Sequence, residues 1–321
     1  MPSIFPTPLT LLQIRLYRSL CLQRDILKIS FPPGSIFEQF KHKNFPQSGE
    51  KLQLKRIKSS TQIVYSTAIT HKIAAQSSQS VAQITEQIAD FVAEHTFGWP
   101  DDWSGACGLE AGVHDVSVQA TSAGLIQVKL GDRAIAAWLN FILYNLPGTT
   151  LNSLNSSLTA LQSSIPASEF QTQVFVIQHA HARCSSLLQM AQREGLITLD
   201  QSEQGSAVWQ FANPESVPWL TPDFHLRLAH PSERRLICQL LAVLDQVGRL
   251  WPQPLANESF RLAKEMSQCF QVFHRDRPIW HSVVNDSTDL AQAQLGLVMA
   301  TQRILYWLLN NLLGISTPSD L

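Results

Sequence analysis

The longest uninterrupted amphipathic pattern in the chain lies between Gln171 and Arg193, a stretch that contains neither Gly nor Pro. Apolar residues recur along it at helical spacing, which predicts an amphipathic helix with one buried face. Its polar side is rich in glutamine, histidine and arginine, and an acid follows only at Glu194. Such a face can bind a partner that is anionic and forms hydrogen bonds.

The same periodicity predicts further helices over residues 8–29, 66–76, 80–95, 133–144, 232–244, 257–273 and 289–313. Alternating residues predict one short basic strand within 51–65 and a hairpin formed by 116–120 and 125–130. Because these strands all lie in the first part of the chain, we expect an α+β domain over residues 1–145. We expect an all-α helical bundle over residues 170–321.

Residues 146–169 lie between these two regions and are rich in Ser, Thr and Asn, which is typical of a linker. Within the second region, residues 199–224 predict a loop-rich insert. Trp209 and Trp219 fall in this insert, and large aromatic residues in loops indicate a contact surface.

Polar and flexible residues mark the expected helix ends. Ser78 or Ser80 can cap the helix over 80–95, and Ser232 can cap the helix that follows it, because a serine hydroxyl accepts a bond from a free amide of the first turn. Gly314 is expected to end the last helix, since Gly adopts the left-handed conformation that terminates helices.

Basic residues are concentrated at the start of the chain. Residues 1–75 contain eleven Lys and Arg against three Asp and Glu, a formal charge of +8, whereas 76–160 carry −6 and 161–321 carry −3. A basic segment on a nearly neutral protein is a candidate binding surface for a polyanion, and the alternative is a solvated face or tail. The candidate phosphate contacts are Lys51, Lys55, Arg56 and Lys58. The alternative is a basic edge strand that protects the protein from aggregation.

The five cysteines are scattered and form no Cys-x-x-Cys pair, which favours buried thiols in a reducing compartment. The first twenty residues are interrupted by prolines and arginines, so they do not form a convincing secretory signal. No run of eighteen apolar residues occurs, and we expect no membrane span. A cytoplasmic location is the resulting expectation.

Residues 176–184 read Val-Ile-Gln-His-Ala-His-Ala-Arg-Cys. This run resembles the Tyr-Val-Gln-Tyr-Ala-His-Ala-Arg signature that opens the DALR-type anticodon-binding domain of arginyl-tRNA synthetases. Three further elements resemble that domain in the same order: His-Pro-x-Glu at 230–233, Phe-Gln-Val-Phe-His at 270–274, and Leu-Leu-Gly-Ile-x-x-Pro-x-x-Leu at 312–321. The resemblance implies a DALR-type bundle over residues 170–321 that binds tRNA.

The first region resembles the N-terminal additional domain of the same family. The matching elements are Ile-Val-Tyr-Ser-Thr at 63–67, Gly-Leu-Ile-Gln-Val-Lys-Leu at 124–130 and a helix with Trp-Leu at 138–139. In that family this domain reads the D-loop of the tRNA. Gln127 takes the place of the polar residue of the family's strand, whereas Leu125 stands where the family has a Phe.

Sequence signatures of catalysis are absent. The synthetases activate arginine with a His-x-Gly-His turn and a Lys-rich loop, and neither occurs in this sequence. No Gly-x-x-x-x-Gly-Lys or Gly-x-Ser-x-Gly motif occurs either. His181 and Cys184 lie one helical turn apart, but two more metal ligands are missing. We therefore expect no enzyme activity, no cofactor and no metal.

The helix over 171–193 offers planar rings, a guanidinium group and amide donors, which suit the unstacked bases of a single-stranded RNA loop. The candidate RNA contacts are Phe175, Gln178, His179, His181 and Arg183 in this helix, and Gln127, Lys55, Arg56 and Lys58 in the first region. The alternative is a helix buried in the bundle, with His181 and Arg183 satisfied internally.

Two functions fit these observations. One is a non-catalytic protein, derived from an arginyl-tRNA synthetase scaffold, that binds tRNA or a tRNA-like RNA. The other is a protein-interaction module or accessory subunit that reuses the scaffold and has lost RNA binding. The family order of motifs and the basic start favour the first function. The replacement of two signature tyrosines by Val176 and His179 favours the second.

Overall fold

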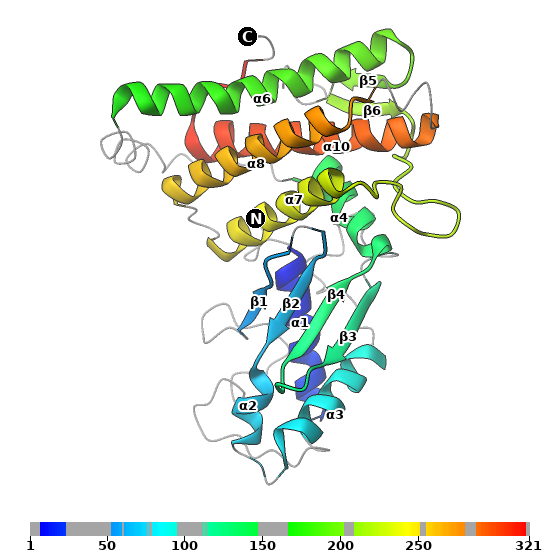
Figure 1. The fold of residues 1–321 in the computed structure, drawn as a ribbon, viewed down its shortest axis with the longest axis vertical. Coiled ribbons are helices and arrows are strands. Elements are labelled where there is room, and N and C mark those ends of the chain that lie inside the picture. The colour runs from blue at the N-terminus through cyan, green and yellow to red at the C-terminus, as the bar shows by residue number, and fades with distance from the viewer. Residues whose placement is uncertain are drawn as a thin grey trace.

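A computed structural model of the 321-residue chain describes residues 7–23, 53–94 apart from 60, 76 and 78, 112, 114–146, 166–201, 209–250, 255–279 and 287–318. Most of the predicted linker, residues 147–165, and Lys51 lie outside the described residues. The described elements form a small sheet with helices in the N-terminal region and a helical bundle in the C-terminal region, as expected (Figure 1).

The N-terminal region contains α1 (Pro8–Gln23), β1 (Leu54–Arg56), β2 (Val64–Thr67), α2 (Ile69–Ala74), α3 (Val81–Glu94), β3 (Val116–Ala120), β4 (Ile126–Leu130) and α4 (Asp132–Tyr144). The strands form an antiparallel sheet in the order β1-β2-β4-β3. The predicted 116–130 hairpin is confirmed, with Gly124 in the left-handed region at φ +72°. The short basic strand predicted within 51–65 is found as β1, and a second strand that was not predicted, β2, follows it after a turn in which the Ser59 hydroxyl accepts from the Thr61 and Gln62 amides.

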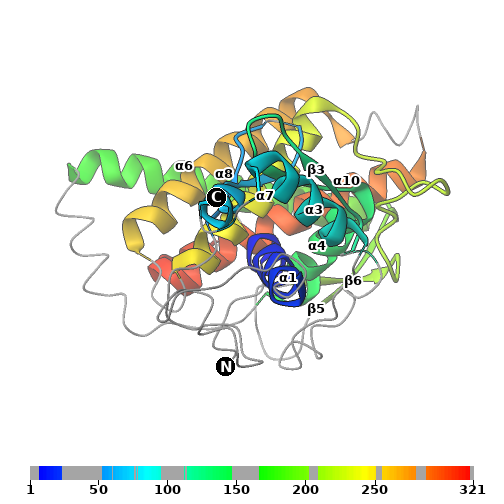
Figure 2. The ribbon, with the colours of Figure 1, turned by 90° about the horizontal axis from the view of Figure 1, so that it is seen from below.

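One face of this sheet is covered and the other is open. Helices α1 and α3 pack together and contact the edge strands on the covered side (Figures 1 and 2). Tyr65, Ile126 and Val128 face this side and are buried. Side chains alternate along each strand, so the residues between them lie on the opposite, open face.

The C-terminal region contains α6 (Ala167–Arg193), β5 (Thr198–Gln201), β6 (Trp209–Asn213), α7 (Pro231–Leu250), α8 (Ala256–Asp276), α10 (Thr288–Tyr306) and a π-helical turn, η3 (Trp307–Leu312). The predicted loop-rich insert includes an antiparallel hairpin, β5–β6, so the region is not purely helical. Helix α6 packs against α8 through Phe170 and Phe260, whose ring centroids are 5.3 Å apart. It packs against α10 through Gln302, which donates to Ser185 at 2.7 Å.

The predicted helix ends are partly confirmed. Ser80 caps α3, since its hydroxyl accepts from the Gln83 amide at 3.3 Å. Gly314 has φ +65° at the end of the last helix, as expected. The prediction for Ser232 is wrong, because it lies inside α7 and its hydroxyl bonds to the His230 ring. At this end the Glu233 carboxylate accepts from the His230 amide at 2.9 Å instead.

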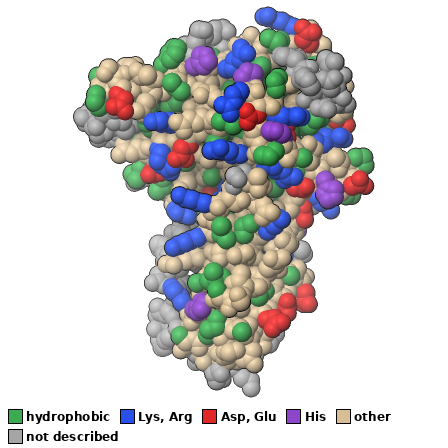
Figure 3. All heavy atoms as spheres, viewed as in Figure 1, with side chains coloured by type: hydrophobic (Ala, Val, Ile, Leu, Met, Phe, Trp, Pro, Cys, Tyr) green, Lys and Arg blue, Asp and Glu red, His purple; other side chains and the backbone are tan. Residues whose placement is uncertain are grey.

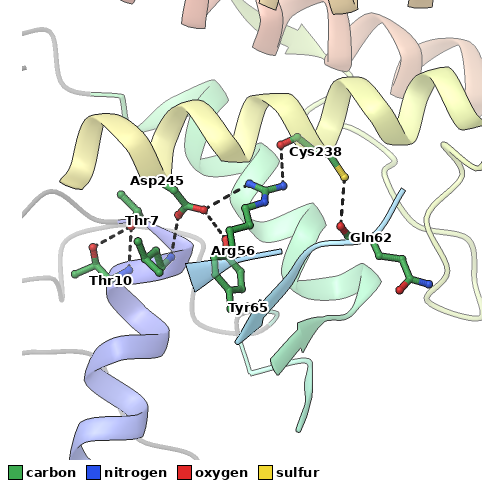
Figure 4. A network of polar contacts seen from close by, with 8 residues as sticks. Thr7, Thr10, Arg56, Gln62, Tyr65, Cys238 and Asp245 are labelled. Carbon is green, nitrogen blue, oxygen red and sulfur yellow. Dashed lines mark hydrogen bonds and ion pairs between the residues drawn. The ribbon is translucent and has the colours of Figure 1, made fainter. Parts of the chain in front are cut away.

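The two regions pack directly on each other through a buried carboxylate on α7 (Figure 4). Asp245 accepts from the Leu9 amide of α1 at 2.9 Å and from the Tyr65 hydroxyl of β2 at 2.7 Å. It also forms an ion pair with Arg56 of β1 at 3.5 Å. Arg56 donates in addition to the Cys238 carbonyl at 2.8 Å. This Asp245 cluster therefore joins three elements of the N-terminal region to one helix of the bundle.

Helix α4 forms a second contact between the regions. The Asp132 carboxylate pairs with Arg234 of α7 at 2.9 Å and accepts from the Leu226 amide at 2.9 Å. Trp219 donates to Asn140 of α4 at 2.7 Å and is 2% exposed. The expectation that Trp219 belongs to a contact surface is therefore wrong, because its ring packs between the regions against Gly296.

Candidate nucleic-acid interface

The long helix α6 has a buried face and an exposed face, as its sequence pattern predicts. Val174, Ile177, Cys184 and Leu188 are buried against the bundle. Helix α6 lies along one side of the bundle, beside α8 and α10 (Figure 1). Its outer face is therefore open to a partner over several turns.

Three of the predicted RNA contacts form one line on this outer face. Phe175, His179 and Arg183 are four residues apart and exposed, and Phe175 has 55% of its surface exposed. The Phe175 and His179 ring centroids are 6.2 Å apart. We call these three residues the α6 stripe. It presents two planar rings and one guanidinium group, the groups that stack on unpaired bases and contact phosphates.

The stripe continues onto α8 through His274, which is not among the residues that the sequence predicts to contact RNA. Arg183 Nε donates to His274 Nε2 at 3.4 Å, and the next residue, Arg275, is exposed. The His274 ring is also stacked on Phe270, with 6.0 Å between the centroids. The family-like Phe-Gln-Val-Phe-His element was the available signal, but its residues did not indicate which of them would meet α6.

Gln178 and His181 face the end of the chain instead. Gln178 Nε2 donates to the Ser316 carbonyl at 2.7 Å, and His181 Nδ1 lies 3.2 Å from the Pro318 carbonyl. His181 is 1% exposed, so the prediction that its ring contacts RNA at the surface is corrected to a role inside the bundle. These two side chains hold residues 314–318 against α6.

Burial lowers the pKa of His181 below its ordinary value of 6.5. The hydrogen bond to the Pro318 carbonyl acts in the opposite direction and has the smaller effect. Burial and then the charge of Arg183 lower the pKa of His274. Both rings are therefore neutral near pH 7. A neutral His274 can accept the hydrogen bond that Arg183 donates, which orients the guanidinium group of the stripe.

Acidification is expected to destabilise the fold through these rings. Their folded-state pKa values are lowered, so below about pH 6.5 the unfolded chain binds more protons than the folded chain. This contribution to stability is fully present when the pH lies above the pKa of the unfolded state. It is lost as the pH falls toward the pKa of the folded state. Urea unfolding at several pH values should show this loss. His181→Gln should make the free energy of unfolding depend less steeply on pH. His179→Gln, at an exposed position of the same helix, is the control. A pH dependence that His181→Gln leaves unchanged would contradict the assignment.

The open face of the N-terminal sheet carries two of the predicted contacts in one row. The strand register pairs Lys55 with Ser66, Ser66 with Gln127, and Gln127 with Gln119. Paired residues share a face, so these four polar side chains cross the sheet side by side. Lys55 is exposed at the edge of the row. Lys58, in the turn after β1, is exposed as well.

Arg56 points to the covered side of the sheet and belongs to the Asp245 cluster. Only 15% of its side chain is exposed, so the proposal that Arg56 contacts RNA is corrected to a role between the regions. Burial raises the pKa of Tyr65 well above 10.0, and the neighbouring Asp245 charge adds to this effect. The Tyr65 hydroxyl therefore stays protonated and donates to Asp245.

Other functional chemistry is not evident in the part of the chain that the structure describes. No group of three or more His, Cys, Asp or Glu side chains could hold a metal ion there. None of the described helices is sufficiently long and apolar to span a membrane. Lys and Arg side chains recur from the bundle down to the sheet on the face seen in Figure 3. This distribution suits a polyanion that contacts both regions.

Comparison with known proteins finds a family match for the C-terminal region. Residues 177–321 match the DALR anticodon binding domain. An arginine–tRNA ligase of Gloeobacter violaceus is 34% identical over 169 residues, which cover 51% of this chain and 25% of the ligase. Arginine–tRNA ligases of a Synechococcus species and of Pelodictyon phaeoclathratiforme are 28% and 32% identical over 47% and 46% of this chain. This chain thus spans about a quarter of the length of the ligases it matches.

Proposed function

We propose that this chain, whose residues 177–321 carry a DALR anticodon binding domain, binds tRNA or a tRNA-like RNA and does not aminoacylate it. The α6 stripe supports the proposal most directly. It lies at the start of the matched domain and exposes two rings and a guanidinium group on one helix face. Single-stranded loops are recognised by such combinations because unstacked bases have open faces and edges.

In this proposal Phe175 and His179 stack on bases of a single-stranded loop. Arg183 then contacts a phosphate between them, and His274 holds its guanidinium group in place. Gln178 and His181 act indirectly, because they fix residues 314–318 beside the stripe. The loop-binding surface thus consists of one helix face bordered by the end of the chain.

The N-terminal sheet supplies a second RNA contact in this proposal. Lys55 and Lys58 would bind phosphates, and Gln127 would donate from the centre of the open face. Phosphate contacts of this kind position an RNA without reading its sequence. The Asp245 cluster fixes the sheet relative to the bundle, so the two contacts are set at a constant separation.

The absence of catalysis is the second part of the proposal. The ligase similarity covers 23–25% of each ligase, and this sequence lacks the His-x-Gly-His turn of the synthetases. We divide the chain into residues 1–145, a linker over 146–169 and the bundle over 170–321. We further propose that it works in the cytoplasm, together with the tRNA pool.

Replacing the stripe should weaken tRNA binding. Phe175→Ala and His179→Ala are each expected to weaken binding of purified total tRNA about 10-fold, because one base–ring stack contributes about 1–3 kcal/mol. Arg183→Ala should reduce the salt dependence of binding by about one phosphate contact. The double variant Lys55→Ala and Lys58→Ala should reduce the salt dependence of binding by about two phosphate contacts. Fluorescence anisotropy at two salt concentrations measures both quantities.

Arg193→Ala is the matched control, because Arg193 is an exposed arginine of the same helix outside the stripe. A DNA duplex of similar length tests whether binding follows charge alone. Binding of tRNA that is no tighter than duplex binding, or that the stripe variants leave unchanged, would exclude the proposal. A pull-down for a protein partner would then test the accessory-subunit function.

A further inference from the structure

The turn between β6 and α7 presents an aromatic side chain that no function assigned so far uses. Phe224 has φ +61° and is the one residue other than Gly with a positive φ among the described residues. A bulky residue in this region is strained and costs about 1–3 kcal/mol. Such conformations persist only where the surroundings hold them and often mark functional positions.

Hydrogen bonds hold this turn in place. Thr221 N donates to the His225 carbonyl at 2.8 Å, and Phe224 N donates to the Thr221 carbonyl at 2.9 Å. The base of the turn is anchored by Leu226, which is buried and donates its amide to Asp132 of α4 at 2.9 Å. The tip is therefore rigid while its side chain remains 57% exposed.

A cation supports one side of the exposed ring. The Arg133 guanidinium carbon lies 4.9 Å from the Phe224 ring centroid. Arg133 is exposed, and among the described residues no carboxylate forms an ion pair with it. The neighbouring Asp132 is instead paired with Arg234 at 2.9 Å. A ring and an exposed guanidinium group thus lie together at a fixed position on the surface.

We propose that Phe224 and Arg133 form a stacking site for an unpaired base of the bound RNA. The ring stacks on the base, and Arg133 contacts the adjacent phosphate. This inference rests on the proposed RNA binding and adds a contact outside the DALR signature. Helix α6 and the segment between β6 and α7 lie on different sides of the bundle, so the site would hold a different part of the RNA from the α6 stripe (Figure 1).

The surroundings favour a base over a protein surface. A stable protein interface needs about 800 Å² from each partner, with an apolar centre. Phe224 is the one exposed large apolar residue of the 220–226 turn. Its neighbours in the turn, Asp223 and His225, are polar and exposed. A single ring above a guanidinium group offers the contact that one base needs.

Phe224→Gly separates binding from folding. Gly accepts the positive φ without strain, so the unfolding temperature should stay within about 2 °C of the wild type. Affinity for purified total tRNA should fall about 10-fold through the lost stack. Arg133→Gln should reduce the salt dependence of binding by about one phosphate contact. Leu255→Gly, which removes a side chain that is 56% exposed elsewhere on the bundle, should leave affinity unchanged.

The outcomes distinguish this site from the proposed function. Wild-type tRNA binding that Phe224→Gly leaves intact would overturn the stacking site and keep the function. No preferential tRNA binding by the wild type would overturn both. If Phe224→Gly abolished self-association in sedimentation while tRNA affinity stayed unchanged, the ring would be a protein contact and the stacking assignment wrong.

Discussion

Asp245→Ala is expected to lower the free energy of unfolding by about 3–5 kcal/mol, because removing one partner of a buried ion pair leaves the other charge uncompensated. Arg56 would keep its largely buried guanidinium group, 15% of whose side chain is exposed, without the carboxylate. The Tyr65 hydroxyl and the Leu9 amide would each lose their acceptor. These losses fall on α1, β1 and β2 together, so this part of the contact between the regions should weaken, while the contact formed by α4 keeps its own bonds.

Urea unfolding followed by circular dichroism measures this effect. Burial raises the pKa of Asp245, while the Arg56 charge and the bonds from Tyr65 and Leu9 favour its ionised form. Asp245→Asn keeps the shape and one acceptor, so it should destabilise less than Asp245→Ala. Glu86→Ala, an exposed acid on α3, is the control and should change stability by less than about 0.5 kcal/mol. An Asp245→Ala protein as stable as this control would contradict the role given to the cluster.

The Asp245 cluster shows where sequence reasoning stops. Helical spacing on α7 predicts that Leu240 and Leu244 are buried, and the structure confirms both. Asp245 follows them as an ordinary charged residue, and nothing local indicates that Tyr65 and Leu9 meet it from 180 and 236 residues away. The sequence predicts an RNA contact for Arg56 for the same reason, because its charge is visible in the sequence and its partner Asp245 is not.

The α6 helix shows a similar limit within one element. A spacing of four residues places Phe175, His179 and Arg183 on one line, so their shared face follows from the sequence. His181 is flanked by Ala180 and Ala182, and its burial depends on packing beside Pro318. The signature therefore mixes exposed residues with residues that hold the end of the chain. Only tertiary contacts separate the two groups.

The sequence pattern predicts one continuous helix over residues 289–313, whereas the structure has an α-helix followed by a π-helical turn. Helix α10 ends at Tyr306 and continues as the π-helical turn Trp307–Leu312. The apolar residues of both segments are buried, so the hydrophobic pattern correctly located the element. A hydrophobic pattern with 3.6 residues per turn cannot indicate this wider turn, because π-helical hydrogen bonds join residues five apart instead of four.

Glu233→Ala is expected to destabilise the bundle by about 3 kcal/mol, since a buried carboxylate with several donors is lost. Glu233 is 1% exposed. It accepts from the His230 amide at 2.9 Å, from Gln294 of α10 at 2.8 Å and from Arg277 at 3.3 Å. One side chain thus satisfies the first turn of α7 and ties it to two other parts of the bundle.

A contact between Glu233 and a ligand is the alternative role for this residue, and its variants distinguish the two roles. Glu233→Gln keeps an acceptor for the His230 amide but loses the charge that pairs with Arg277, so urea unfolding should give an intermediate loss of stability. Glu265→Ala, an i+4 partner of Arg261 on the surface of α8, should cost less than about 1 kcal/mol. If Glu233→Ala left stability unchanged and weakened only tRNA binding, the residue would belong to the RNA interface. Because all three recorded donors to its carboxylate lie inside the protein, we expect the loss of stability instead.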